Sequence, residues 1–262
     1  MLKNTFQHIA GIGSKTEQLL WRKGILTWEG FLGHEKPILS PDRDAHICRE
    51  LELSLFHQED IHFFLDRLPQ QEHWRLFEPF KEQAVFLDIE TSGGYQGLDE
   101  ITVIGLYDGQ KVQTFVNGHN LEDFEQAMTS YSLVITFNGS CFDLPYLRRW
   151  FKHLSLPQAH IDLRFFLKKL GLRGGLKAIE KKMGLSRDPA VEGLNGFDAV
   201  LLWKAYQWGD QSALERLILY NTMDIVQLKP LMELSAREMK KRLLLFDGLA
   251  KSQSSFKRRS GG

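Results

Sequence analysis

Short apolar runs separated by polar turns predict a β-rich region in the middle of the chain. Apolar residues 85–87 lead directly into the segment Asp88-Ile89-Glu90-Thr91, which is typical of a buried strand that reaches the edge of a sheet. Two further β-rich runs, 101–107 and 111–116, flank the dipeptide Asp108-Gly109, a strong hairpin signal. The pattern predicts three antiparallel strands, then a helix over 121–128 and a buried strand over 133–137.

Apolar residues at helical spacing predict helices in the flanking parts of the chain. A helix that ends at Gly24 follows the turn Gly11-Ile12-Gly13, and the spacing from Ser40 to about Leu68 also indicates helix. Residues 69–80 form a connector with aromatic anchors, and 211–228 form a late amphipathic helix. We therefore expect a helical region over residues 1–80, an α/β domain over 81–245, and a basic, disordered tail over 246–262.

Composition narrows the class of protein without identifying its function. The 262 residues are 43% hydrophobic and 25% charged, which is ordinary for a soluble globular protein. The net charge of +0 means that any attraction for nucleic acid or membranes requires a local patch. Cys48 and Cys141 are too far apart to suggest a disulfide framework or a zinc site. Because no apolar run is long enough for a signal core or a bilayer span, we expect a cytoplasmic protein without membrane partners.

Carboxylates gather where the predicted strands end. Side chains alternate along a strand, so Asp88 and Glu90 point to the same face, where they repel each other and are costly to bury unless paired or bound to a metal. A divalent cation such as Mg²⁺ or Mn²⁺, which prefers oxygen ligands, would resolve both problems. Two solvated acids at a strand end are an equally weighted alternative. Asp143 follows the strand 133–137 at a helix start, which by itself favours a helix-initiating role.

Three more residues join the carboxylates as candidates. Tyr220 and Asp224 are four positions apart on the helix over 211–228 and therefore lie on one side of it. Taken alone, such a pair is usually structural. Asp162 is interpreted as a helix cap, with an acidic metal ligand as the alternative.

Positive charge is concentrated between residues 164 and 187, where eight basic residues accompany one acidic residue. Three glycines divide this block into two short helices, and Lys177 and Lys181 lie one turn apart on the second. In a protein without net charge, such a concentration fits the guidance of a polyanion. A solvated helix face is the common alternative.

The N-terminal turn Gly11-Ile12-Gly13, with the helix after it, resembles the helix-hairpin-helix motif, which binds the nucleic-acid backbone without reading sequence. Backbone amides at a glycine turn suit a phosphate, and Gly11, Gly13 and Lys15 are the candidates for this contact. Glu17 stands where the motif usually has a small residue. The alternative is a local core that includes Trp21 and Trp28, and both interpretations can hold together.

Three motifs in order resemble the DEDD 3′–5′ exonucleases of the ribonuclease H-like superfamily. They are Asp-Ile-Glu-Thr at 88–91, Asn-x-x-x-Phe-Asp at 138–143 and Tyr-x-x-x-Asp at 220–224. The histidine branch of that group has a histidine five positions before its last aspartate. Leu219 holds this place here, so the chain looks like the tyrosine branch. Residues 81–228 also resemble the YprB-type ribonuclease H-like domain family, which implies a mixed β-sheet flanked by helices.

The resemblance implies an enzyme that hydrolyses phosphodiester bonds of single-stranded nucleic acid at 3′ ends and releases nucleoside 5′-monophosphates. Two Mg²⁺ or Mn²⁺ ions would be held by four carboxylates, and Tyr220 would orient the attacking water. The four carboxylates are Asp88, Glu90, Asp143 and Asp224. The candidate nucleic-acid contacts of the domain are Thr91, Asn138, Phe142, Arg173, Lys177 and Lys181.

Other functions remain as alternatives at this point. The domain is alternatively a structure-specific endonuclease of the same superfamily, a nucleic-acid-binding module with an idle site, or an interaction scaffold. Internal cleavage would indicate the endonuclease, and binding without turnover would indicate the binding module. A lack of salt-sensitive binding would indicate the interaction scaffold. The choice between RNA and DNA depends on contacts to the 2′-hydroxyl, to which the sequence assigns no residue. The sequence also assigns no oligomeric state.

Overall fold

The protein is described by a computed structural model that covers residues 1–94, 99–157 and 159–257, with the backbone alone from residue 245 onward. Its chain divides into two compact units. The first comprises Met1–Lys81 and Ala236–Gly262, and the second comprises Glu82–Ser235. The second unit thus begins near the boundary expected at residue 80 and ends before the expected residue 245.

The first unit is helical. Its elements are η1 (Leu2–Asn4), α1 (Ser14–Arg22), α2 (Trp28–Leu32), α3 (Pro41–Phe56), α4 (Ile61–Leu65), η2 (Gln70–Leu76) and α5 (Phe77–Phe80), and η3 (Lys81–Gln83) leads into the second unit. The stretch from Ser40 to Leu68 is two helices rather than one, because Asp60 caps α4 by accepting a hydrogen bond from the His62 N–H. Aromatic rings fill the core: Trp28 stacks on Phe64 with centroids 5.8 Å apart.

Glu17 in α1 is buried in a polar network that replaces the small residue expected at this position. Its carboxylate accepts hydrogen bonds from Thr5 Oγ1 at 2.6 Å and from the Phe6 N–H at 2.8 Å, and pairs with Arg75 at 3.0 Å. The network ties the residues ahead of the Gly11-Ile12-Gly13 turn to α1. Within residues 1–13, all of which the structure describes, those residues form η1 and turns, and no α-helix precedes the glycine turn.

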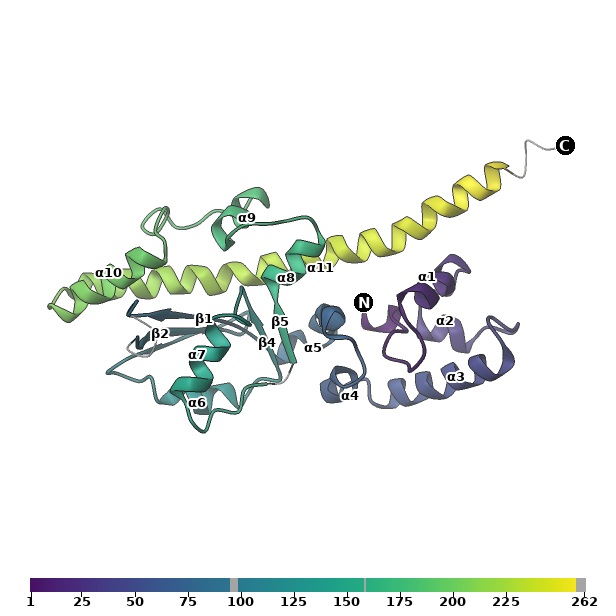
Figure 1. Cartoon of the computed structure of the whole chain (residues 1–262), viewed down its shortest axis with the longest axis horizontal. Coiled ribbons are helices and arrows are strands. Elements are labelled where there is room, and N and C mark those ends of the chain that lie inside the picture. Colours follow the sequence, from purple (N-terminus) through teal and green to yellow (C-terminus); the bar gives the residue numbers. More distant parts are fainter. Residues whose placement is uncertain (95–98, 158, 258–262) are drawn as a thin grey trace. The chain divides into compact units, whose positions relative to one another are not determined.

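The second unit is built on a five-stranded mixed sheet with strand order β3-β2-β1-β4-β5 (Figure 1). The strands are β1 (Ala84–Thr91), β2 (Ile101–Tyr107), β3 (Val112–Val116), β4 (Leu133–Thr136) and β5 (Ala159–Asp162). The first three are antiparallel neighbours, whereas β4 and β5 run parallel to β1. The predicted antiparallel strands, the hairpin at Asp108-Gly109 and the buried strand β4 are confirmed. β5, which has only four residues, was not predicted.

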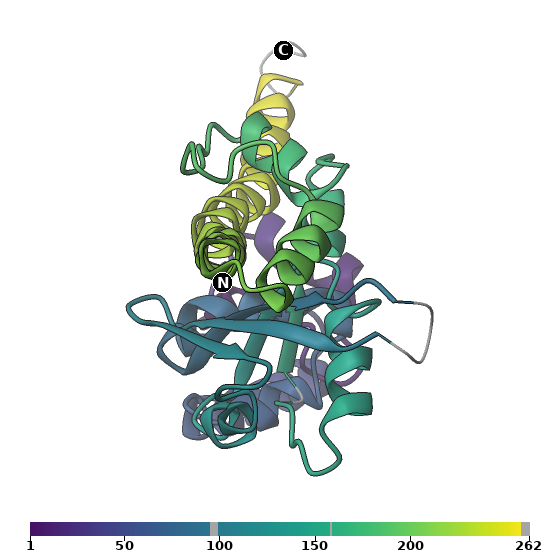
Figure 2. The same ribbon diagram turned by 90° about the vertical axis from the view of Figure 1, so that its left-hand side faces the viewer.

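Helices cover both faces of this sheet (Figures 1 and 2). On one face, α6 (Asp123–Met128) and α7 (Asp143–Trp150) pack on Val85, Leu87 and Ile89 of β1. On the other face, α10 (Gly196–Gln207) and the first part of α11 (Gln211–Lys257) pack on Val103 and Val116. The basic block contributes α8 (Leu163–Lys169) and α9 (Leu176–Lys182), the two short helices that were predicted. The α/β class with a helix-flanked mixed sheet is confirmed.

The helical content differs from the prediction at three places. α11 continues past residue 228 through Pro230 to Lys257, because buried Leu231 and Met232 continue its apolar face. The tail expected to be disordered from residue 246 is therefore helical up to Lys257, and its remainder, 258–262, lies outside the described residues. α10 was not predicted, since its apolar residues Phe197 and Leu201 are exposed and break the amphipathic pattern. No helix among the residues described has the length and apolar character that a membrane span requires.

Candidate active site

β1 presents Asp88 and Glu90 on the face of the sheet that α11 covers. Residues 85, 87 and 89 of this strand pack under α6 and α7, so alternation turns Asp88 and Glu90 to the other face. Asp224 on α11 meets them there. One carboxylate oxygen from each of the three residues lies within 4.8 Å of the other two. The structure thus brings three of the predicted metal ligands together.

Asp143, the fourth predicted ligand, reaches the same strand from α7. It is buried at the first residue of that helix, and its Oδ1 accepts a hydrogen bond from the Ile89 N–H at 3.0 Å. Ile89 lies between Asp88 and Glu90, so this bond fixes the Asp143 carboxylate beside both. Asp143 is outside the group of three that share the 4.8 Å limit. It supports the group from the adjacent strand end.

Burial is the main reason why the carboxylic acids of this site have raised pKa values. It raises the pKa of Asp88 well above its usual range, and the neighbouring charges of Asp143 and Glu90 raise it further. The pKa of Glu90 is also raised, first by burial and then by the charges of Asp224 and Asp143. Burial also raises the pKa of Asp143 to about 7, although the hydrogen bond from Ile89 opposes the shift. Buried acids that repel one another are the environment in which a divalent cation binds.

Arg187 is a part of the site that sequence reasoning missed. Its guanidinium forms a bidentate ion pair with Glu180 of α9, with distances of 2.6 and 2.7 Å, and its Nη1 contacts Asp224. Arg187 and Glu180 are both almost fully buried. In the sequence, Arg187 is only the last cation of a basic block, so no local signal separates it from exposed lysines. The structure assigns it to the support of Asp224.

Tyr220 lies one helical turn before Asp224 and is held by Lys177. The Lys177 Nζ donates a hydrogen bond to the Tyr220 hydroxyl at 2.8 Å and lies 4.3 Å from the ring centroid. It also donates to the Leu194 carbonyl. Burial raises the pKa of Tyr220 far above its usual range, with Asp224 and Glu90 acting in the same direction. Tyr220 is therefore a neutral phenol whose own proton remains available for donation.

Asn221, the next residue of α11, was also missed by sequence reasoning. Its amide donates to Asp88 Oδ2 at 3.1 Å and to the Asp88 carbonyl at 3.3 Å. Gly105 of β2 lies opposite Asp88. It makes room for Asn221, because a Cβ at position 105 would collide with Asn221 Oδ1. The signal in the sequence was a glycine inside a strand, which often marks a close approach of another segment.

Asn138 follows β4 at the same edge of the sheet and adopts a left-handed backbone conformation with φ of 68°. Asp162 at the end of β5 fixes it: the carboxylate accepts hydrogen bonds from the N–H groups of Asn138 at 2.8 Å and Ser140 at 3.0 Å. Asp162 also caps α8 by accepting from the Arg164 N–H, so its interpretation as a helix cap is confirmed. The Asn138 side chain accepts a hydrogen bond from Arg164 at 2.6 Å.

The other predicted nucleic-acid contacts are distributed over both units. In the second unit, Thr91 is half-buried at the end of β1, Phe142 is exposed against Tyr146, and Lys181 is exposed on α9, one turn beyond Lys177. Arg173 is exposed between α8 and α9. In the first unit, Gly11 and Gly13 line a cavity of about 630 Å³ and Lys15 is exposed in α1.

Comparison with known proteins places this site within a recognised family. The family model described as the RNase_H superfamily matches residues 85–236, more than half of the chain, and this range contains all four acidic residues. A search of curated proteins gave no match.

Several solved structures are similar to parts of the chain. The family B DNA polymerase from the hyperthermophilic archaeon Pyrobaculum calidifontis is 15% identical with a TM-score of 0.48, and the match covers 57% of this chain but only 24% of the polymerase. Brucella melitensis NrnC is 20% identical with a TM-score of 0.40 over 70% of this chain and 89% of NrnC. Escherichia coli RNase D, an exoribonuclease involved in structured RNA processing, is 18% identical with a TM-score of 0.43 over 69% and 48% of the two chains. At these values, no conclusion about substrate or activity follows from the likeness.

Proposed function

Because the chain belongs to the RNase_H superfamily, we propose that it is a metal-dependent 3′–5′ exonuclease of single-stranded nucleic acid. One observation carries the proposal. Asp88, Glu90 and Asp224 bring carboxylate oxygens within 4.8 Å of one another, on the side of the sheet where Tyr220 precedes Asp224 by one helical turn. These four residues occupy the acidic and tyrosine positions of two of the three motifs by which the sequence resembles the exonucleases, Asp-Ile-Glu-Thr and Tyr-x-x-x-Asp.

The residues present fit a divalent metal. All the candidate ligands offer oxygen, and the buried Glu90 Oε1 has no hydrogen-bond partner among the described residues. Asp88, Glu90, Asp143 and Asp224 would hold Mg²⁺ or Mn²⁺, and we propose that two ions bind. When bound, such a pair lowers the pKa of a water and stabilises the leaving 3′ oxygen.

Tyr220 would orient the attacking water rather than deprotonate it. Since the Tyr220 pKa is raised, its hydroxyl stays protonated at neutral pH and cannot act as a base. Lys177 donates to the Tyr220 oxygen, which leaves the phenol proton free to point at a water. Together, Lys177 and Tyr220 supply a fixed hydrogen-bond donor beside Asp224.

Binding of the strand is proposed to rest on backbone contacts without sequence readout. Exposed cations of the second unit, such as Arg173 and Lys181, together with the glycine turn and Lys15 of the first unit, suit phosphates. These contacts are the same for RNA and DNA, so the sugar preference is a matter for measurement.

The experiment that tests the function uses RNA and DNA strands labelled at the 5′ end or at the 3′ end. The purified protein is incubated with each strand in Mg²⁺, in Mn²⁺ and in EDTA. We expect 5′-labelled strands to shorten one nucleotide at a time, 3′-labelled strands to release labelled nucleoside 5′-monophosphate, and EDTA to abolish both reactions.

Other outcomes would replace the proposal with one of its alternatives. Internal cuts in a circular strand would indicate an endonuclease of the same superfamily. Binding of all four strands without any metal-dependent product would indicate a nucleic-acid-binding module with an idle site.

A further inference from the structure

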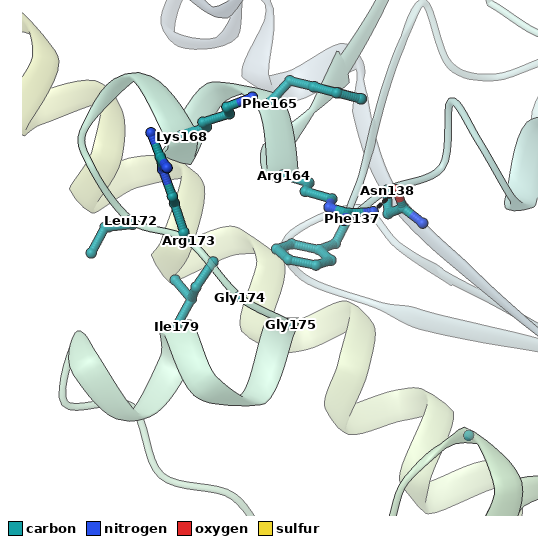
Figure 3. A pocket seen from close by; sticks show the side chains of 11 residues that line it. Phe137, Asn138, Arg164, Phe165, Lys168, Leu172, Arg173, Gly174, Gly175 and Ile179 are labelled. Atoms are coloured by element: carbon teal, nitrogen blue, oxygen red, sulfur yellow. Dashed lines mark hydrogen bonds between the residues drawn. The ribbon is translucent and has the colours of Figure 1, made fainter.

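A second cavity lies at the edge of the sheet where β4 and β5 end. It measures about 1010 Å³, a volume within the range of pockets that hold small ligands. Asn138 and Phe137 come from the end of β4, Arg164, Phe165 and Lys168 come from α8, and Arg173 comes from the loop after α8 (Figure 3). Because β1, β4 and β5 are parallel, the ends of β1 and β4 and the start of α8 occupy one edge.

The cavity is cationic. Arg164, Lys168 and Arg173 contribute three positive side chains, and no acidic residue of the described ranges lines the cavity. Arg164 is held in place by its 2.6 Å hydrogen bond to Asn138. Lys168 and Arg173 are exposed, and no carboxylate of the described part of the chain forms an ion pair with either. Such uncompensated cations around a cavity favour a polyanion.

Two aromatic rings in the lining of the cavity offer surfaces on which a base can stack. The Phe165 side chain is 50% exposed although it is large and apolar, and Phe137 is half-buried at the end of β4. A site for a simple anion gains little from aromatic faces, whereas unpaired bases stack on them. Cations for phosphate beside rings for bases fit one nucleotide unit of a single strand.

We propose that this cavity, which we call the α8 pocket, is a binding subsite for a nucleotide further to the 5′ side than the two nucleotides that flank the cleaved bond. The proposal rests on the proposed function, which places the 3′ end at Asp88, Glu90 and Asp224. A strand that leaves this group across the end of β4 reaches Asn138 and then α8. Arg164, Lys168 and Arg173 bind the phosphates, and Phe165 stacks on a base.

The test compares substrates of two lengths. The double variant Lys168→Gln/Arg173→Gln removes two exposed charges and is matched by Lys111→Gln/Lys204→Gln, which removes two exposed charges outside the pocket. For a 12-nucleotide single strand, we expect KM to rise about tenfold or more in the pocket variant while kcat stays within about twofold. For a dinucleotide, whose two nucleotides only flank the cleaved bond and under this proposal leave the α8 pocket empty, we expect KM to stay unchanged.

Binding without turnover provides a second readout. In EDTA, the slope of log Kd against log salt for the 12-nucleotide strand should decrease in magnitude by about 1.4 in the pocket variant, because two phosphate contacts are lost. Phe165→Ala should weaken binding by about tenfold with no change in that slope. This readout separates the two proposals. If wild-type protein yields no metal-dependent product, the proposed function fails, whereas the α8 pocket is still tested by binding.

Three results would overturn the subsite. The first is a loss of affinity for the long strand no larger than in the Lys111/Lys204 variant. The second is an equal loss for the dinucleotide, which would mean that the substitutions disturb the catalytic centre. The third is binding of free nucleoside monophosphate that depends on Lys168 and Arg173 while the kinetics of the long strand stay unchanged. That result would make the pocket a site for a free nucleotide.

Discussion

Tyr220 shows how one buried hydroxyl acquires a defined role from its neighbours. Lys177 occupies its oxygen with a 2.8 Å hydrogen bond, and nearby carboxylates help to keep it protonated. The two side chains therefore act as a unit: Lys177 fixes the oxygen, and the phenol proton is the part that can reach a water.

Substitution of this pair tests that unit. We expect Tyr220→Phe and Lys177→Met each to lower kcat by about tenfold to a hundredfold. The double variant should be no slower than the slower single variant, because both changes remove the same oriented hydrogen bond. Single-turnover rates measure this, and Lys204→Met, exposed on α10, serves as the control. Losses that multiply in the double variant would show that the two residues act independently.

His8 in the first unit makes a second prediction at the residue scale. Its ring packs against both Trp28 and Phe64, and burial lowers its pKa from 6.5 to about 3. Below pH 6.5 the unfolded chain binds a proton that the folded chain does not, so the stability of the first unit falls as the pH falls. His8 alone lowers the free energy of unfolding by about 2 kcal/mol when the pH falls from 7 to 5.

His8→Phe should remove that part of the pH dependence. Ser54 lies within hydrogen-bond distance of His8 Nε2 but donates its own proton to the Glu50 carbonyl, so the phenylalanine leaves that donor satisfied. Urea denaturation at pH 7 and pH 5 measures the difference, with exposed His62→Phe as the control. An unchanged pH dependence in His8→Phe would mean that His8 is not buried in its neutral form.

At the scale of elements, α11 organises the site. It carries Asp224, Tyr220 and Asn221 on successive parts of one face and lays them against the face of β1 that presents Asp88 and Glu90. The contact is close because Gly105 in β2 has no side chain. The geometry of the acidic site therefore depends on a glycine in the neighbouring strand.

Gly105→Ala should push α11 away from the sheet. A Cβ there would collide with Asn221 Oδ1 and approach Ile225 Cδ1 to 2.9 Å. We expect a loss of about 1–3 kcal/mol in the free energy of unfolding, together with a lower kcat because Asn221 no longer holds Asp88. Gly196→Ala, where nothing lies within 4 Å of the new Cβ, should change the unfolding free energy by less than about 0.5 kcal/mol. Equal effects of the two substitutions would contradict the packing argument.

Element patterns explain which parts of the structure were predictable. The strands β1 to β4 and their hairpin follow from apolar runs and Asp108-Gly109, because these signals are local. Asp88, Glu90 and Asp224 were predictable through strand alternation and motif order. Arg187, Glu180 and Asn221 were not, since each acts through a tertiary contact that leaves no local pattern. The predicted helix ended at residue 228, whereas buried Leu231 and Met232 carry α11 onward past Pro230.

At the scale of the whole molecule, a chain without net charge places its charges unevenly. The second unit concentrates buried carboxylates at the end of β1 and exposed cations on α8 and after it. Without a cation between them, the carboxylates destabilise the fold at neutral pH. Metal binding is therefore coupled to the stability of the second unit.

The pH dependence of stability in EDTA tests this coupling. Asp143 has a pKa raised from 3.8 to about 7 by burial. At pH values between 3.8 and 7, Asp143 is protonated in the folded chain but ionised in the unfolded chain, so the free energy of unfolding falls as the pH rises. For Asp143 alone, the decrease from pH 5.5 to pH 7.5 is about 2 kcal/mol. Asp143→Asn, which keeps an oxygen for the Ile89 N–H, should remove that part of the dependence. Glu215→Gln, at an exposed position on α11, should leave the pH dependence unchanged. Mg²⁺ should stabilise the wild-type protein most at pH 7.5.

In the proposed enzyme, the carboxylates on β1 and α11 carry out metal-dependent hydrolysis while separate surfaces hold the strand. The most direct measurement compares wild type with Asp88→Asn on one 5′-labelled single strand, following both turnover in Mn²⁺ and binding in EDTA. We expect turnover to fall by at least about a thousandfold in Asp88→Asn and Kd to change by less than about threefold. Retention of metal-dependent turnover by Asp88→Asn would contradict the proposal, because the site would then lie elsewhere.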